Sequence, residues 1–248
     1  MTTRIGPIAA AFLLVCIPTS GALAQVLETE QVDRTIPFDG GGTLKLKNFS
    51  GDIRITGTDT GEVTIHAVRR ATRERLDRIK LSIETTASTI AIDANDRGDN
   101  RDDRNNVVET SFDIRVPRRI SLDVHSFSST LVIDQVEGRH SVHNFSGDVR
   151  LTRVGGPVRA KTFSGRIELD AADTGHDLDF DTFSGDIELV LPQQAGADIR
   201  VNSFSGDIRT DLPITLMSKS RREMHAVLNG GGSEVRVKTF FGDVRLRQ

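Results

Sequence analysis

The sequence predicts an all-β fold: a β-solenoid or flattened parallel stack of strands, with 18 to 21 residues per unit and one short helix. Three observations predict it. One phrase recurs along the chain, its copies follow at nearly constant spacing, and each copy holds two short runs of alternating apolar and polar residues. Such alternation is typical of strands, and a period near 20 residues is typical of units that bury their apolar faces by stacking. An antiparallel β-sandwich of hairpins is the alternative.

The first 24 residues have the pattern of a secretory signal peptide. Arg4 gives a positive start, an apolar run covers 8–17, and Ala22 and Ala24 have the spacing that signal peptidase prefers. The apolar run is shorter than the roughly 20 residues needed to span a bilayer, and no later segment could span one either. We therefore expect an exported protein that is periplasmic, outer-membrane-associated or secreted, with one domain over 25–248.

The repeated phrase reads apolar-x-apolar-x-(Asn/Ser/Thr)-Phe-Ser-Gly-Asp-apolar-x-apolar. Glycine permits the tight turn between its two strands. From the second copy onward the Phe positions follow at steps of 18, 18, 20, 21 and 36 residues, and the last step predicts one degenerate copy in between. Seven of the twelve Phe residues share this slot, and six copies keep the Gly: Phe49, Phe127, Phe145, Phe163, Phe183, Phe204 and Phe240, with Gly51, Gly147, Gly165, Gly185, Gly206 and Gly242.

Parallel stacking predicts that residues at one slot form columns in sequence order. Opposite charges then become neighbours, and Glu168–Glu188 is the one clear like-charge contact. Exposed pairs of this kind contribute well under about 1 kcal/mol each, so they fix register more than stability. The predicted pairs are Arg159–Asp179–Arg200, Lys161–Asp181, Arg150–Glu168 and Glu188–Arg209.

Two segments interrupt the repeat. The irregular insertion covers about 56–120, where we expect a short surface helix within 71–80, strands at 81–84, 89–93 and 107–116, and a polar loop at 95–106. The second insert covers 214–233. It carries a basic patch of Lys219, Arg221 and Arg222 and a glycine turn at 230–232.

Composition excludes several classes of site. Cys16 is the only cysteine and lies in the expected signal, so disulfides, thiol catalysis and cysteine-bound zinc are not expected after cleavage. A lipoprotein would be acylated at Cys16, but Val15 stands where that signal needs a small residue. The 32 Lys and Arg against 35 Asp and Glu give a net charge of −3 with no basic stripe, so we expect no nucleic-acid partner.

On these residues the chain resembles a bacterial family of exported β-strand-repeat proteins named as adhesins, whose domain has no assigned function. The likeness covers most of the chain, from the NFSGD pattern at 48–52 to the Gly-rich run at 229–233 before the final copy. It implies a right-handed stacked β fold and an envelope or secreted location. It implies no catalytic residues. The regular Phe before Ser-Gly departs from the commoner family pattern.

The Phe column has two interpretations. Alternation directs these side chains outward, but the turn at Ser-Gly can reverse the direction. We expect a ladder buried at the turn, because an exposed one would form a large apolar patch. The alternative is a partner-binding stripe on the surface.

Metal sites have weak support. His125 and His143 fall on adjacent rungs of one column, with Asp123 and His140 nearby, and are candidates for a transition metal. Histidines that only face solvent are commoner, so we expect no metal and no cofactor. A calcium column at the turn Asp is interrupted by Arg166, and a calcium-like loop at 93–104 has Arg at ligand positions.

The function predicted is a non-enzymatic binding or structural module of the bacterial envelope, with an unidentified envelope protein or polysaccharide as partner. One alternative is a carbohydrate-active β-helix enzyme, for which Asp177, Asp179 and Asp181 alternate along one strand. Basic column neighbours make these acids ion-pair partners instead. The other alternative is a periplasmic accessory protein in envelope stress or signalling.

Overall fold

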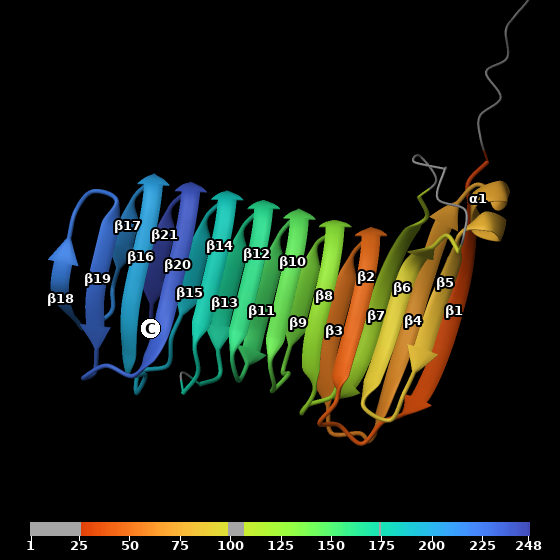
Figure 1. Cartoon of the computed structure of the whole chain (residues 1–248), viewed down its shortest axis with the longest axis horizontal. Helices are drawn as coiled ribbons and strands as arrows, with labels where there is room; N and C mark the ends of the chain where they lie inside the picture. Colours follow the sequence, from red (N-terminus) through yellow and green to blue (C-terminus); the bar gives the residue numbers. More distant parts are fainter. Residues whose placement is uncertain (1–25, 99–106, 174) are drawn as a thin grey trace, which may run out of the picture.

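The computed structural model describes residues 26–98, 107–173 and 175–248. The expected signal peptide with Cys16, and most of the polar loop at 95–106, lie outside these residues. Within them the chain forms two long sheets whose strands run across the long axis of the molecule (Figure 1). One continuous hydrophobic core draws on both sheets. The all-β stacked fold expected from the repeat is confirmed.

Ten strands form the first sheet, called sheet A. In spatial order they are β1 (Glu28–Pro37), β4 (Glu62–Ala71), β7 (Glu109–Pro117), β3 (Ile53–Thr58), β9 (Leu131–Asp134), β11 (Val149–Val154), β13 (Ile167–Ala171), β15 (Ile187–Val190), β21 (Val244–Arg247) and β17 (Ile208–Thr210).

Eleven strands form the second sheet, called sheet B. In spatial order they are β18 (Ile214–Lys219), β19 (Glu223–Leu228), β16 (Ala197–Ser205), β20 (Ser233–Phe241), β14 (Leu178–Ser184), β12 (Val158–Ser164), β10 (His140–Ser146), β8 (Ser121–Ser128), β2 (Thr43–Ser50), β6 (Thr89–Asp96) and β5 (Lys80–Thr85).

Each repeat places its first strand in sheet B and its second strand in sheet A. Equivalent strands pair in parallel and in register, as in His143 with His125 and with Lys161. The antiparallel sandwich alternative is therefore wrong. In both sheets buried residues alternate with exposed ones, which places the apolar slots in the interior and the charged slots in solvent.

The order of the last repeats differs from the sequence order. β20 lies between β14 and β16, and β21 lies between β15 and β17. The final copy, around Phe240, therefore inserts between the copies of Phe183 and Phe204. The segment between the copies of Phe204 and Phe240 is not the degenerate repeat that the spacing predicted, because it forms the antiparallel hairpin β18–β19 at the edge of sheet B.

This order corrects two predicted columns. Asp179 lies beside Arg236 and not Arg200, and Glu188 lies beside Arg245 and not Arg209. Arg200 instead approaches Glu234 at 3.3 Å. The pairs Arg159–Asp179, Lys161–Asp181 and Arg150–Glu168 form as predicted, at 3.1, 3.7 and 2.7 Å, and Glu168 does lie beside Glu188.

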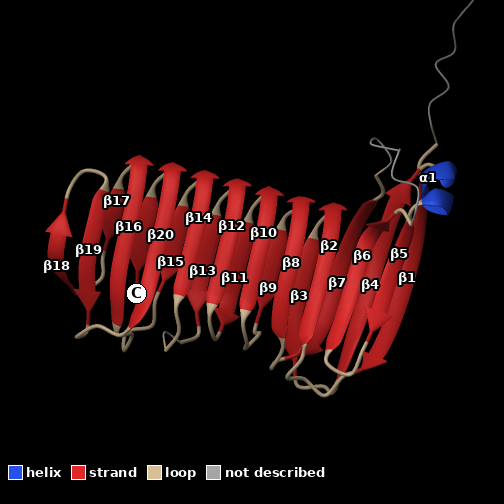
Figure 2. Cartoon of the chain, in the orientation of Figure 1, coloured by secondary structure: helices blue, strands red, loops and turns tan. Residues whose placement is uncertain are grey.

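The insertion covers the other end of the stack. β2 and β3 pair directly with β8 and β9, and the expected strands of the insertion appear as β5, β6 and β7 beyond them. β1 and β4, which were not predicted, complete that end as an antiparallel pair. The expected short helix is α1 (Arg73–Arg78), which has six residues (Figure 2). Its Leu76 side chain is buried. No helix in the described part of the chain is long and apolar enough to cross a membrane.

In six of the seven repeats a glycine with positive φ makes the turn between the two strands, and the copy around Phe127 has Ser129 there. Gly165 has φ of +143° and Gly185 has φ of +153°, and a Cβ on either would meet the backbone carbonyl of the glycine one rung below. The turns thus stack backbone on backbone. The remaining repeat glycines at this turn, Gly51, Gly147, Gly206 and Gly242, also have positive φ.

Candidate binding groove

The Phe column lies on the outer face of sheet B, so the expected burial of this ladder is wrong. The seven side chains are between 37 and 49% exposed. The turn begins after the residue that follows Phe, so strand alternation holds through the Phe position and directs it outward. By contrast, Phe180, three residues before Phe183, points into the interior and is fully buried.

The rings form one continuous stack, called here the Phe ladder. Successive ring centroids are 4.4 to 5.1 Å apart, with interplanar angles of 1 to 16°. Seven rungs at the strand spacing of about 4.8 Å make the ladder about 29 Å long. In spatial order it runs Phe49, Phe127, Phe145, Phe163, Phe183, Phe240 and Phe204.

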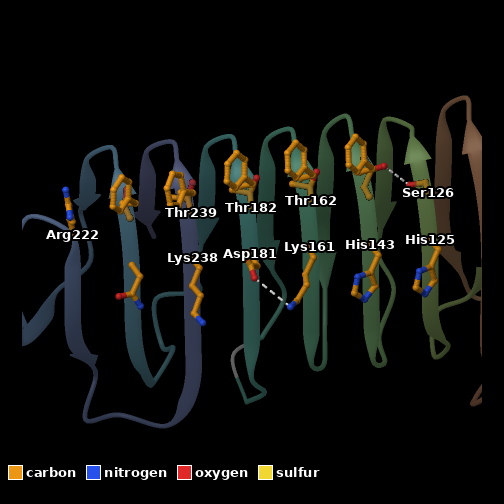
Figure 3. Close-up of a pocket in the computed structure, with 18 of the residues that line it drawn as sticks. His125, Ser126, His143, Lys161, Thr162, Asp181, Thr182, Arg222, Lys238 and Thr239 are labelled. Atoms are coloured by element: carbon orange, nitrogen blue, oxygen red, sulfur yellow. Dashed lines mark hydrogen bonds and ion pairs between the residues drawn. The ribbon is translucent and has the colours of Figure 1, made fainter.

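A groove of about 790 Å³ follows the ladder across five repeats. One wall is the Phe ladder and the other is a row of polar side chains, two residues earlier on each strand. Figure 3 shows that row crossing neighbouring strands through His125, His143, Lys161, Asp181 and Lys238. The groove therefore has one apolar side and one polar side along its length.

Small polar residues immediately before the ladder Phe residues lie beneath the groove, and several of them hold the turn, whereas the Thr162 and Thr182 hydroxyls find no hydrogen-bond partner among the described residues. The Asn144 side-chain amide donates to the carbonyl oxygens of Ser129 and Gly147, at 2.8 and 2.9 Å. The Ser126 hydroxyl donates to Asn144 at 2.8 Å, and the Thr239 hydroxyl donates to the Gly185 carbonyl at 3.2 Å. These bonds satisfy backbone groups that the glycine turn leaves without ladder partners, and so fix the Phe above them.

The hairpin β18–β19 ends the groove. The Arg222 guanidinium lies 4.4 Å from the centre of the Phe204 ring, at the last rung of the ladder. Arg222 is visible beside the end of the groove in Figure 3. The predicted basic patch thus meets the predicted Phe column, a juxtaposition that sequence spacing alone did not reveal. Phe241, in place of the usual Ser, adds an edge-on ring against Phe183 and Phe240.

The two candidate metal-ligating histidines do come together. The rings of His125 and His143 stack at 4.9 Å, and His125 Nε2 lies 3.1 Å from an Asp123 carboxylate oxygen. Partial burial, followed by the charges of His125 and Lys161, lowers the pKa of His143. His140 is not part of this cluster, because it points into the core. Among the described residues no three His, Cys, Asp or Glu side chains gather as a metal site.

The alternating acids of β14 are engaged by neighbours. Asp179 and Asp181 pair with Arg159 and Lys161, and Asp177 accepts a hydrogen bond from the backbone N–H of Glu234 at 3.0 Å. The Asp residues of the glycine turns act similarly. The Asp148 carboxylate accepts a hydrogen bond of 2.9 Å from the backbone N–H of Arg166 in the next repeat. These carboxylates therefore serve the stacking of repeats.

Comparison with solved structures gives several matches, and one of them has a TM-score above 0.5. A "putative cell adhesion protein" from Clostridium sporogenes matches with a TM-score of 0.54 at 11% identity, covering 89% of this chain and all of that one. A "putative lipid binding protein" from Parabacteroides distasonis and a "putative adhesin" from Bacteroides fragilis match less closely, with TM-scores of 0.39 and 0.34 at 11 and 10% identity. They cover 87 and 88% of this chain, and 96 and 97% of their own.

At such identities these likenesses concern the fold alone. No curated protein matches the chain. The sequence does match the family described as Toastrack DUF4097, a domain of unknown function, over residues 27–247. That range includes every strand of both sheets, and the chain therefore belongs to the Toastrack DUF4097 family.

Proposed function

We propose that this protein is an exported, non-enzymatic binding module of the bacterial envelope, and that its ligand lies in the groove along the Phe ladder. The observation that carries the proposal is the half-exposure of seven stacked Phe side chains on one face. A contiguous apolar patch of this kind on a soluble domain marks an interaction site. The groove volume of about 790 Å³ lies within the range of ligand pockets, about 300 to 1,000 Å³.

The charged groups near the groove support binding in preference to catalysis. The acids that could act on a glycosidic bond are the β14 carboxylates. Arg159 pairs with Asp179 at 3.1 Å and Lys161 pairs with Asp181 at 3.7 Å, so both carboxylates are already engaged between neighbouring repeats and not free in the groove.

Binding is tested with an apolar fluorophore, N-phenyl-1-naphthylamine, whose emission rises in an apolar site. We expect the wild-type protein to bind it and the double variant Phe163→Thr/Phe183→Thr to lose most of that signal. Threonine keeps strand propensity. The matched control is Leu216→Thr/Met217→Thr, which removes exposed apolar side chains from β18 outside the groove lining. Equal loss in both double variants, or no binding by wild type, would refute the proposal.

Export is tested separately by mass spectrometry of the protein recovered from the native host. The signal pattern predicts a chain that begins at Gln25 in an envelope or culture fraction. Recovery of the uncleaved chain from the cytoplasm would contradict this part of the proposal.

A further inference from the structure

The Phe ladder restricts what its groove can hold. The rings stack face to face at 4.4 to 5.1 Å, so no planar base can enter between them and only ring edges face outward. Nucleobases require free aromatic faces. The face of the last ring is covered by Arg222. The ladder therefore offers a continuous apolar edge to a linear ligand, and no stacking platforms along its length.

The groove also excludes an added β-strand. Strand addition needs an open sheet edge with unpaired backbone groups, whereas this groove crosses the face of paired strands in sheet B. A linear hydrocarbon has no side-chain period to match and needs no hydrogen bonds, so it fits an apolar wall that is uniform along its length.

The end of the groove at the hairpin supplies positive charge. Within the described part of the chain, neither the Arg222 guanidinium nor the Lys238 ammonium lies within 4.0 Å of a carboxylate. Arg222 uses one face of its guanidinium on the Phe204 ring, which leaves the N–H groups at the edge of that plane available as a fork for an oxyanion. Two acids line the groove near these cations: Glu223, which follows Arg222 in sequence, and Asp181, which is the cross-strand neighbour of Lys238 and pairs with Lys161. Arg221, adjacent in sequence, lines the neighbouring hollow with Arg222.

We propose that the groove binds one anionic amphiphile, with its linear apolar chain along the Phe ladder and its oxyanion head group at Arg222 and Lys238. This inference rests on the proposed binding function and names the ligand class. The head group lies at the end beside β19, and the chain extends toward Phe145 and the stacked histidines. Arg222 precedes β19 and Lys238 is on β20, with β16 between them, so a sulfonate, carboxylate or phosphate head is attracted by both cations from a position between them.

The test uses two permanently charged probes of equal chain length, decanesulfonate and decyltrimethylammonium, below their micelle concentrations. Isothermal titration calorimetry on the full mature chain should give one site that prefers the sulfonate by at least about tenfold, the value of one charge-assisted hydrogen bond. The double variant Arg222→Gln/Lys238→Gln should lose that preference while it still binds N-phenyl-1-naphthylamine. Arg54→Gln/Arg115→Gln, on sheet A, is the matched control and should retain the preference.

Three results would overturn the ligand class. One is equal affinity for the two probes. Another is binding to phosphatidylglycerol vesicles but not to the monomeric sulfonate, which would indicate a membrane surface. The third is a concentration-dependent dimer in analytical ultracentrifugation that Phe163→Thr/Phe183→Thr abolishes, which would make a second copy the occupant. If naphthylamine binding still depends on the ladder in these cases, the proposed binding function stands and only the ligand class is wrong.

Discussion

Phe180 on β14 and Phe163 on the neighbouring strand β12 have opposite environments. Phe180 is fully buried, whereas Phe163 on the ladder is 48% exposed. Phe180→Ala should cost about 3 to 5 kcal/mol of the free energy of unfolding, because it leaves a cavity in the shared core. Phe163→Ala should cost only about 1 to 2 kcal/mol, from half the burial and its ring stacking. Urea unfolding of both variants measures the difference, and equal losses would place the ladder in the core after all.

His140 is the one histidine in the core, at a slot that other repeats fill with Val or Leu. Burial lowers its pKa from the ordinary value of 6.5, against the opposing effect of hydrogen bonds from Nε2 to the carbonyls of Gly155 and Val136. The unfolded chain then binds a proton that the folded chain does not, so the free energy of unfolding falls as the pH drops below about 6.5.

The His140→Gln variant should show a shallower fall in stability between pH 7.5 and 5.5 than the wild type. His143→Gln is the control: the pKa of His143 is also lowered, but the side chain lies at the surface, so its removal should change the slope less. Urea unfolding at several pH values gives the slopes. An unchanged slope in His140→Gln would show that another group carries the acid sensitivity.

At the scale of the elements, the glycine turns are the least tolerant part of each repeat. Gly165→Ala should lower the free energy of unfolding by more than about 2 kcal/mol, because its φ of +143° disfavours a Cβ and that Cβ would meet the Gly147 carbonyl. Gly41→Ala isolates the first effect, since Gly41 has φ of +72° but no atom within 4 Å of the new Cβ. The control should lose only about 1 to 2 kcal/mol, and a loss equal to that of Gly165→Ala would remove the packing argument.

The elements that sequence could predict are those with a local signal. Alternation and the Phe-Ser-Gly spacing were enough for the strands, their parallel register and three of the predicted ion pairs. The direction of the Phe side chains was not predictable from the same pattern, because it depends on whether the turn starts before or after the serine. The groove was missed for the same reason.

At the scale of the whole molecule, the order of the repeats carries no local signal. Arg200 and Arg236 occupy the same slot, as do Arg209 and Arg245, so the charge columns read equally well in either order. What distinguishes the two orders is the antiparallel hairpin β18–β19. The hairpin pairs with the outer edge of β16, and β20, which follows the hairpin in the chain, pairs with the opposite edge, next to β14. This arrangement is visible only in the three-dimensional structure.

The inserted copy gives a prediction for truncation. In a solenoid stacked in sequence order, removal of the last repeat costs one rung and one interface. Here deletion of 233–248 removes β20 and β21 from between two other rungs, so β16 and β17 lose their parallel partners and the hairpin loses its attachment to the stack. We expect that, in the truncated chain, the C-terminal third no longer unfolds cooperatively with the rest of the stack when urea is added. A full-length-like transition would contradict the importance of this insertion.

The position of β20 and β21 also bears on the time course of folding. Synthesis proceeds from the N-terminus, so the rungs up to β15 can stack while later residues are still being made. β16 and β17 have no native parallel neighbour to dock on until the last sixteen residues have left the ribosome, or the translocation channel if the chain is exported. Completion of the apolar groove and arrival of its cationic end are therefore late, simultaneous events, and a chain that lacks these residues would stack five of the seven ladder rings, with Phe204 and Arg222 not yet joined to them.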